Sequence, residues 1–262
     1  MKYGDRVYLL AEDGSDFIIE LKEGEKFVTH LGSVEHSEIV KADLGDVVET
    51  NLKKKIYVLK PGIVENIFKM KRKTQIVYPK DIGFILLMLD VKEGDRIVEA
   101  GVGSGAMCSA FARLVGDGGK VFAYERREDF LKLARENLKR WKLLERVELK
   151  LKDISEGFDE EEIDAVFLDV PDPWNYIESA WKALKGGGRL GVICPTTNQV
   201  QETLRAIESF PFVRVEVWES LFRRYKPNPE RLRPFDRMVA HTTYMIFAVK
   251  VNSKNDEDKG ED

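Results

Sequence analysis

The sequence is poor in cysteine and has no long hydrophobic run. Two cysteines, Cys108 and Cys194, among 262 residues exclude a disulfide-rich scaffold, and they lack the spacing of a metal site. No segment approaches the roughly 20 uncharged apolar residues that a membrane-spanning helix needs. The first residues carry acids where a signal peptide would carry an apolar stretch. We therefore expect a soluble, cytoplasmic protein with no metal and no membrane partner.

Charge is almost balanced over the chain but unevenly distributed along it. The 42 lysines and arginines face 46 acidic residues, giving a net charge of −4. Residues 52–73 nevertheless contain eight basic residues and one acid, and residues 222–237 contain six basic residues and two acids. Two separated basic clusters on a nearly neutral body are compatible with a polyanionic partner, although either cluster alone is equally typical of a solvated surface.

The first part of the chain predicts a small β domain, residues 1–62. Short apolar runs are separated by turn-type residues, as in a series of hairpins, at 5–11, 16–21, 26–30, 46–50 and 56–59. Pro61 and Gly62 end this pattern, and residues 63–80 are expected to form a connecting helix, over 63–70, and a loop.

From about residue 81 the pattern changes to regular β-α alternation. Strands are expected at 96–100, 120–125, 147–151, 165–169 and 189–194, and helices at 82–89, 106–115, 128–141, 174–184 and 198–209. Such alternation predicts an α/β domain, residues 81–251, with a mostly parallel sheet covered by helices on both faces. No helical pattern separates 213–219 from 243–249, so these last strands should be antiparallel. Residues 252–262 are acidic and expected to be disordered.

A glycine-rich loop, residues 99–106 (EAGVGSGA), directly follows the first strand of the α/β domain and opens a helix. Its glycines allow a sharp turn and close approach of the backbone to a ligand, and the helix N-terminus offers free N–H groups. The loop by itself is a weak signal. It also matches the dinucleotide fingerprint, so an NAD-dependent enzyme has to be considered.

Acidic residues at the ends of the next strands favour S-adenosylmethionine over NAD. Glu125 lies twenty positions after Gly105, where a carboxylate can accept hydrogen bonds from a ribose diol. Asp153 ends the third strand, where it can accept from an adenine amino group, and Asp169 ends the fourth. Ligands of open α/β sheets bind at these carboxyl ends. Each acid taken singly is as well explained by a helix cap or a solvated turn.

Five segments together resemble the tRNA (adenine-N1)-methyltransferases: YPKD at 78–81, the glycine loop, LDVPDPW at 168–174, CPTTNQV at 194–200 and RMVAHT at 237–242. The resemblance covers about residues 4–250. It implies a small N-terminal β domain, a class I (Rossmann-like) methyltransferase domain and a homotetramer. It also implies that the chain transfers a methyl group from S-adenosylmethionine to N1 of adenosine 58 in the T-loop of tRNA.

The resemblance also implies site residues. Asp169 matches the family's key aspartate, and Asp169 and Tyr78 are the expected catalytic residues. Tyr78 would line the adenine pocket or cover the methionine end of the cofactor. The residues expected to bind the cofactor are Glu99, Gly101, Gly103, Ser104, Gly105, Ala106, Met107, Glu125, Arg126, Asp153 and Asp169.

Phosphate contacts to tRNA are expected from the two basic clusters. The candidates are Lys71, Arg72, Lys73, Arg223, Arg224, Lys226, Arg231 and Arg233, the last five on a proline-containing segment expected to be a long loop near the pocket. Three alternatives stay open: a methyltransferase acting on another substrate such as protein isoaspartate, a non-catalytic RNA-binding subunit of the same fold, and a nicotinamide dehydrogenase.

Overall fold

The computed structural model describes residues 1–252, which belong to two compact units, Met1–Met70 and a second unit that begins at Lys71. The predicted connecting segment 63–80 is shared between them: α2 (Ile63–Phe68) belongs to the first unit and α3 (Pro79–Met88) to the second. Of the predicted acidic tail, residues 253–262 lie outside the described residues. None of the helices within residues 1–252 is long and apolar enough to cross a membrane.

The first unit is built on a four-stranded antiparallel sheet in the order β2-β1-β6-β5. Its strands are β1 (Arg6–Ala11), β2 (Asp16–Glu20), β5 (Val47–Glu49) and β6 (Lys55–Leu59). Along β1, Val7, Leu9 and Ala11 alternate with less buried residues, as a strand with one face on the core requires. A hairpin of β3 (Lys26–Thr29) and β4 (Gly32–Glu35) leads into α1 (His36–Lys41).

The second unit contains a seven-stranded sheet in the order β12-β15-β11-β10-β7-β8-β9. The strands are β7 (Arg96–Ala100), β8 (Lys120–Glu125), β9 (Val147–Leu151), β10 (Ile163–Leu168), β11 (Leu184–Cys194), β12 (Phe212–Trp218) and β15 (Tyr244–Lys250). Neighbouring strands pair in parallel except where β15 meets β11 and β12. The prediction of a mostly parallel sheet with an antiparallel final strand is confirmed.

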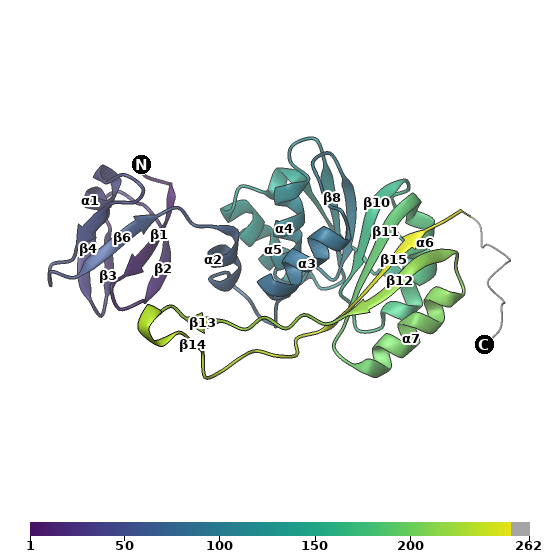
Figure 1. The fold of residues 1–262 in the computed structure, drawn as a ribbon. Coiled ribbons are helices and arrows are strands. Elements are labelled where there is room, and N and C mark those ends of the chain that lie inside the picture. Colours follow the sequence, from purple (N-terminus) through teal and green to yellow (C-terminus); the bar gives the residue numbers. More distant parts are fainter. Residues whose placement is uncertain (253–262) are drawn as a thin grey trace. The chain divides into compact units, whose positions relative to one another are not determined.

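Helices cover both faces of this sheet. Figure 1 shows α3, α4 (Ala106–Leu114) and α5 (Glu128–Arg140) on one side and α6 (Ile177–Ala183) and α7 (Thr197–Glu208) on the other. Burial on both faces explains the continuous apolar runs in the central strands, such as Ala165–Leu168 in β10. Short 3₁₀ turns flank two of the strands: η1 (Leu144–Arg146) precedes β9, and η2 (Ile154–Glu156) and η3 (Pro173–Tyr176) follow β9 and β10.

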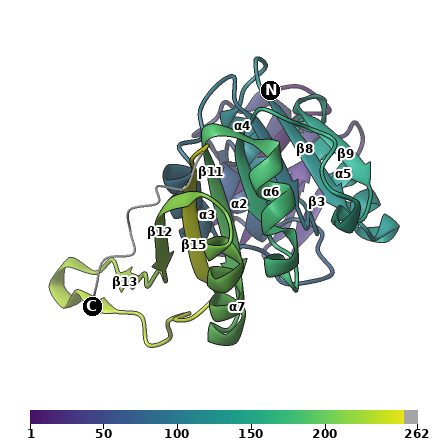
Figure 2. The same cartoon turned by 90° about the vertical axis from the view of Figure 1, so that its right-hand side faces the viewer.

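Residues 221–240, here called the arm, connect β12 to β15 (Figure 2). We predicted a long loop here, and this was wrong in one respect, because the arm folds back on itself as a hairpin. Strands β13 (Tyr225–Lys226) and β14 (Arg233–Pro234) pair, and η4 (Pro229–Arg231) forms the turn. The Asn228 side chain caps η4 by accepting from two backbone N–H groups, which closes the turn in spite of the prolines.

Candidate functional site

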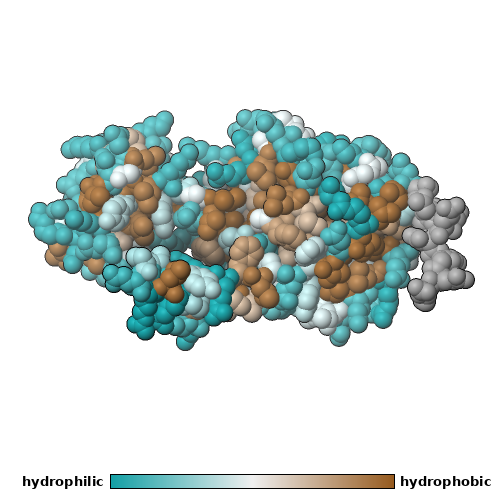
Figure 3. Space-filling view, viewed as in Figure 1, coloured by the Kyte–Doolittle hydropathy of each residue, from teal (hydrophilic) through white to brown (hydrophobic). Residues whose placement is uncertain are grey.

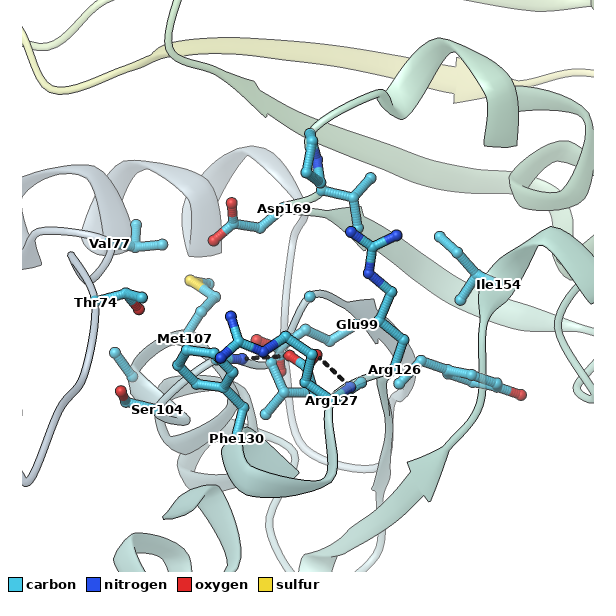
Figure 4. A pocket seen from close by; sticks show the side chains of 18 of the residues that line it. Thr74, Val77, Glu99, Ser104, Met107, Arg126, Arg127, Phe130, Ile154 and Asp169 are labelled. Atoms are coloured by element: carbon cyan, nitrogen blue, oxygen red, sulfur yellow. Dashed lines mark hydrogen bonds between the residues drawn. The ribbon is translucent and has the colours of Figure 1, made fainter. Parts of the chain in front are cut away.

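A cavity of about 320 Å³ opens at the carboxyl ends of the parallel strands in the second unit. Its walls come from separate loops that the sheet brings together: residues 74–77, the glycine loop, the ends of β8, β9 and β10, and Tyr176 of η3. Figure 4 shows Glu99, Met107 and Asp169 directed into one hollow from three different elements. The volume is at the lower end of the range usual for small-molecule sites.

The glycine loop packs directly against the strand that carries Asp169. Gly101 has φ +89°, and a β-carbon there would lie 1.8 Å from the backbone oxygen of Asp169. The Gly101 N–H donates to the Tyr124 carbonyl at 3.0 Å, and the Asp169 N–H donates to the Ala100 carbonyl at 2.8 Å. Only glycine fits Gly101, for both its conformation and its contact. These bonds set the position of Asp169 beside the loop.

Glu125, at the end of β8, is fixed by two backbone groups. One carboxylate oxygen accepts from the Gly103 N–H at 3.1 Å and the other from the Arg127 N–H at 3.0 Å. An ionised carboxylate offers about four acceptor positions, so two remain for a ligand. The pair of bonds therefore ties the glycine loop to β8 and leaves a bidentate acceptor facing the cavity.

Asp153 lies two residues beyond the end of β9 and caps η2. Its Oδ1 accepts from the Ser155 N–H at 2.9 Å, and this bond lowers the pKa of Asp153, with a smaller contribution from the charge of Arg126. The Ser155 side chain also hydrogen-bonds to this carboxylate and lowers its pKa further. Asp153 is therefore an ionised acceptor at the cavity wall next to the buried Ile154.

Glu99, Glu125 and Asp169 share the cavity, and two of these carboxyl groups are strongly perturbed. Burial, together with the charges of Asp169 and Glu125, raises the pKa of Glu99 to about 8. The pKa of Asp169 is raised to about 7 because surrounding protein desolvates it and Glu125 is a like charge, although its side chain opens on the cavity. A positively charged ligand would relieve this repulsion. Within residues 1–252, no group of three His, Cys, Asp or Glu side chains is placed to hold a metal ion.

Two buried oxygens at the cavity have no partner in the described part of the chain: Oε2 of Glu99 and Oγ of Ser104. A buried polar atom without a partner is costly and calls for an explanation. Glu99 can accept from an ammonium group and Ser104 can donate to a carboxylate. A ligand carrying both groups, as the methionine end of S-adenosylmethionine does, fits this pair.

Ten of the eleven residues predicted to bind the cofactor line the cavity, and the exception is Gly105. Tyr78 does not line it either; it is the N-cap residue of α3, directly after the lining residue Val77. None of the predicted tRNA-contacting residues lines it. The sequence interpretation missed Thr74–Val77, Arg127, Phe130 and Tyr176. Phe130 is a buried residue of α5, and an apolar residue of a helix gives no sign of a ligand site; no local pattern marks residues 74–77 as part of a cavity.

The strand order, the glycine loop after β7 and the acids at or just beyond the ends of β8, β9 and β10 together define a class I S-adenosylmethionine-dependent methyltransferase domain. Similarity to known proteins then specifies the family. The chain belongs to the family described as tRNA methyltransferase complex GCD14 subunit, which it matches over residues 54–235. Residues 1–48 match the domain described as TrmI-like N-terminal.

Individual relatives agree with this assignment. The chain is 32% identical to the tRNA (adenine(57)-N(1)/adenine(58)-N(1))-methyltransferase TrmI of Methanocaldococcus jannaschii, over 92% of this chain and 93% of that protein. It is 35% identical to the tRNA (adenine(58)-N(1))-methyltransferase TrmI of Thermus thermophilus, over 91% and 94% of the two chains.

Solved structures cover nearly the whole fold. The crystal structure of tRNA (m1A58) methyltransferase TrmI from Aquifex aeolicus has a TM-score of 0.84 and 35% identity, over 97% of this chain and 99% of that one. A Thermotoga maritima structure described as a SAM-dependent O-methyltransferase has a TM-score of 0.94 and 60% identity, over 97% and 96%.

Proposed function

We propose that the protein is an enzyme that transfers a methyl group from S-adenosylmethionine to N1 of adenosine 58 in the T-loop of tRNA. The observation that carries the proposal is one cavity in which Asp169 lies against the glycine loop and which two residues with unpartnered buried oxygens, Glu99 and Ser104, also line. The relatives named for this reaction match the chain nearly end to end, which supports the choice of substrate.

The cavity residues divide into groups suited to the parts of the cofactor. Glu99, Ser104 and the backbone of Gly103 would hold the methionine end. Glu125 would accept from the ribose hydroxyls, and Asp153 from the adenine amino group beside Ile154. Bound S-adenosylmethionine supplies a methyl group on a sulfonium, which is the electrophile of the reaction.

Asp169 would act on the acceptor base. N1 of adenine has an in-plane lone pair, so attack requires alignment and exclusion of water and no prior deprotonation. The purine becomes positively charged as N1 is alkylated, and a carboxylate beside it stabilises that charge and can accept a proton from N6. Asp169 suits this role, because it is a carboxylic acid that directly follows β10 and lines the cavity. The role of Tyr78 stays a prediction.

The tRNA contacts would come from basic side chains outside the cavity. Arg223, Arg224 and Arg231 are exposed on the arm, whose tip is mostly hydrophilic in Figure 3. Lys71, Arg72 and Lys73 are exposed just before the cavity-lining segment 74–77. Positive charge in these positions suits the phosphate backbone, which supplies most of the affinity for nucleic acid. A homotetramer and action in the cytoplasm, where the tRNA substrate is processed, belong to the same proposal.

The proposal is tested by incubating the protein with labelled S-adenosylmethionine and unmodified tRNA transcripts. We expect label to enter the transcript with adenosine at position 58 and not a transcript with guanosine there. Label incorporated into protein, or attached to oxygen, would favour the isoaspartate or O-methyl alternatives. Heat on titration with NAD and none with S-adenosylmethionine would favour the dehydrogenase. Cofactor binding without transfer would favour a non-catalytic subunit.

A further inference from the structure

A buried polar cluster lies at the start of α3, outside the cavity. Asp81 is fully buried, and the side chain of its neighbour Lys80 is 12% exposed. The Lys80 ammonium lies 2.9 Å from Asp81 Oδ1, and it donates to the carbonyl and hydroxyl of Ser220, both at 2.9 Å, and to the hydroxyl of Thr242 at 2.6 Å. The two hydroxyls in turn donate to Asp81, Ser220 at 2.6 Å and Thr242 at 2.7 Å.

The partners in this cluster are the two ends of the arm. Ser220 precedes residues 221–240 and Thr242 follows them, so one ion pair on α3 holds both segments at a single point. A second connection joins the same two segments: His241 Nδ1 lies 2.6 Å from Glu219 Oε1, and Nε2 lies 3.0 Å from the Pro195 carbonyl. Both partners are acceptors, which raises the pKa of His241, chiefly through the bond to Glu219.

Hydrogen bonds, an ion pair and a cation-π contact join the two halves of the arm to each other. Lys226 pairs with Asp236 at 2.8 Å, Phe235 N–H donates to the Arg224 carbonyl at 2.9 Å, and the Arg224 guanidinium lies 4.8 Å from the Phe235 ring centroid. In the described part of the chain, the hydrogen bonds and ion pairs that shape residues 221–240 join arm residues to one another. The hairpin thus has its own internal bonds, and the cluster on α3 holds its two ends.

The cluster also adjoins the cavity. Val77, which lines it, lies three residues before Lys80. Pro195 directly follows β11, the strand beside β10 and Asp169, and the nearby Gln199 side chain donates to the carbonyl of the lining residue Pro171 at 2.9 Å. Movement at the arm's ends would therefore change the distance between the arm's arginines and the cavity.

We propose that Lys80 and Asp81 are positioning residues that hold both ends of the basic arm, and so fix the distance between the phosphates bound by the arm and the base presented to Asp169. The inference rests on the proposed function, since it takes tRNA as the arm's ligand. The ion pair acts through Ser220 and Thr242 and does not touch the reacting atoms. A misplacement of about 1 Å is enough to lower the rate of an oriented reaction by about a hundredfold.

The test variant is the double substitution Ser220→Ala and Thr242→Val. It removes both hydroxyls that tie the arm to α3 but leaves Lys80 paired with Asp81, so no buried charge loses its counter-ion. The matched rescue variant exchanges the hydroxyl residues, Ser220→Thr and Thr242→Ser. Ser209→Ala, an exposed serine at the end of α7, serves as a neutral control.

The first measurement needs no tRNA. Spin labels at Glu230→Cys on the arm and Leu87→Cys on α3, both exposed, report the distance between arm and domain by electron resonance, because the native Cys108 and Cys194 are buried. We expect a narrow distribution in the parent and in the rescue variant and a broad one in the Ala/Val variant. An unchanged distribution in the Ala/Val variant overturns the proposal.

The second measurement is steady-state methylation of a tRNA transcript. We expect kcat/KM for tRNA to fall by about tenfold or more in the Ala/Val variant, with S-adenosylmethionine affinity by calorimetry unchanged. A broadened distance with unchanged kcat/KM overturns the positioning role. If the parent protein methylates no tRNA, the proposed function fails and the RNA role falls with it, whereas the distance measurement still decides whether the cluster holds the arm.

Discussion

Gly101 and Asp169 are in such close contact that a single added carbon does not fit between them: a β-carbon on Gly101 would lie 1.8 Å from the Asp169 backbone oxygen. The glycine loop and the end of β10, which carries the proposed catalytic residue Asp169, therefore cannot move independently of each other. Gly101 therefore shapes the glycine loop and also limits where the backbone of Asp169 can lie.

The first prediction concerns this contact. Gly101→Ala should displace the loop or Asp169 and weaken S-adenosylmethionine binding by about tenfold or more, since the clash adds to the cost of a positive φ. Gly94→Ala is the matched control, because Gly94 has φ +90° with nothing within 4 Å, against +89° for Gly101. Calorimetric titration compares the two. Equal S-adenosylmethionine affinities in the two variants would show that the contact between Gly101 and Asp169 does not affect cofactor binding.

The second prediction concerns the charge of Asp169. Asp169→Asn should lower kcat for tRNA methylation by about 100- to 1,000-fold, the usual effect of losing one group that stabilises developing charge. The fold should be retained, because the Asp169 backbone bond to Ala100 is kept. Asp90→Asn, an exposed acid on the surface, is the control. Turnover at the parental rate in Asp169→Asn would remove this residue from the mechanism.

Much of the α/β domain could be predicted because its signals are local. Buried parallel strands such as β10 contain continuous apolar runs, here residues 165–168, and glycines at 101, 103 and 105 mark the loop. Acids after three strands could be placed at one edge because parallel strands end together. Hairpin strand β4 and helix α1 were missed, since Val34 and Ile39 are the only well-buried apolar residues that mark them.

The remaining walls of the cavity could not be predicted, because they depend on tertiary packing. Thr74–Val77 has no element of its own, and it reaches the cavity through the position of α3. The two partners that fix the arm, Ser220 and Thr242, lie about 140 and 160 residues from Asp81 in the chain, and nothing in their local sequence relates them. The hairpin of the arm was hidden by its prolines, which usually interrupt strands.

The third prediction concerns pH. The pKa of Glu99 is raised to about 8 in the folded protein, so the protonated form is favoured by folding. The associated stability is present at acid pH and is lost as pH rises from the carboxyl's ordinary range through about 8. We expect the urea midpoint of the cofactor-free protein to fall between pH 5 and 9, and to fall less in Glu99→Gln. The exposed Glu161→Gln should keep the parental slope, and identical slopes in all three would contradict the account.

The fourth prediction concerns the arm. The double charge reversal Arg223→Glu and Arg231→Glu should weaken tRNA binding by about tenfold or more and flatten its dependence on salt, since fewer counterions are released. Both side chains are exposed, and S-adenosylmethionine affinity should be unchanged. Arg113→Glu on α4 is the control for a charge reversal outside the arm. A mobility assay that finds the same tRNA affinity in the arm variant would exclude the arm as the phosphate contact.

The central claim is that one cavity holds a methyl donor and directs its carbon to a ring nitrogen of a tRNA base. The most direct test uses S-adenosylmethionine with a deuterated methyl group and an unmodified transcript, followed by digestion and mass spectrometry of the nucleosides. The account predicts deuterated 1-methyladenosine, mapped to position 58 and greatly reduced with Asp169→Asn. Deuterium on another atom or another nucleoside, or equal yields from both proteins, would contradict it.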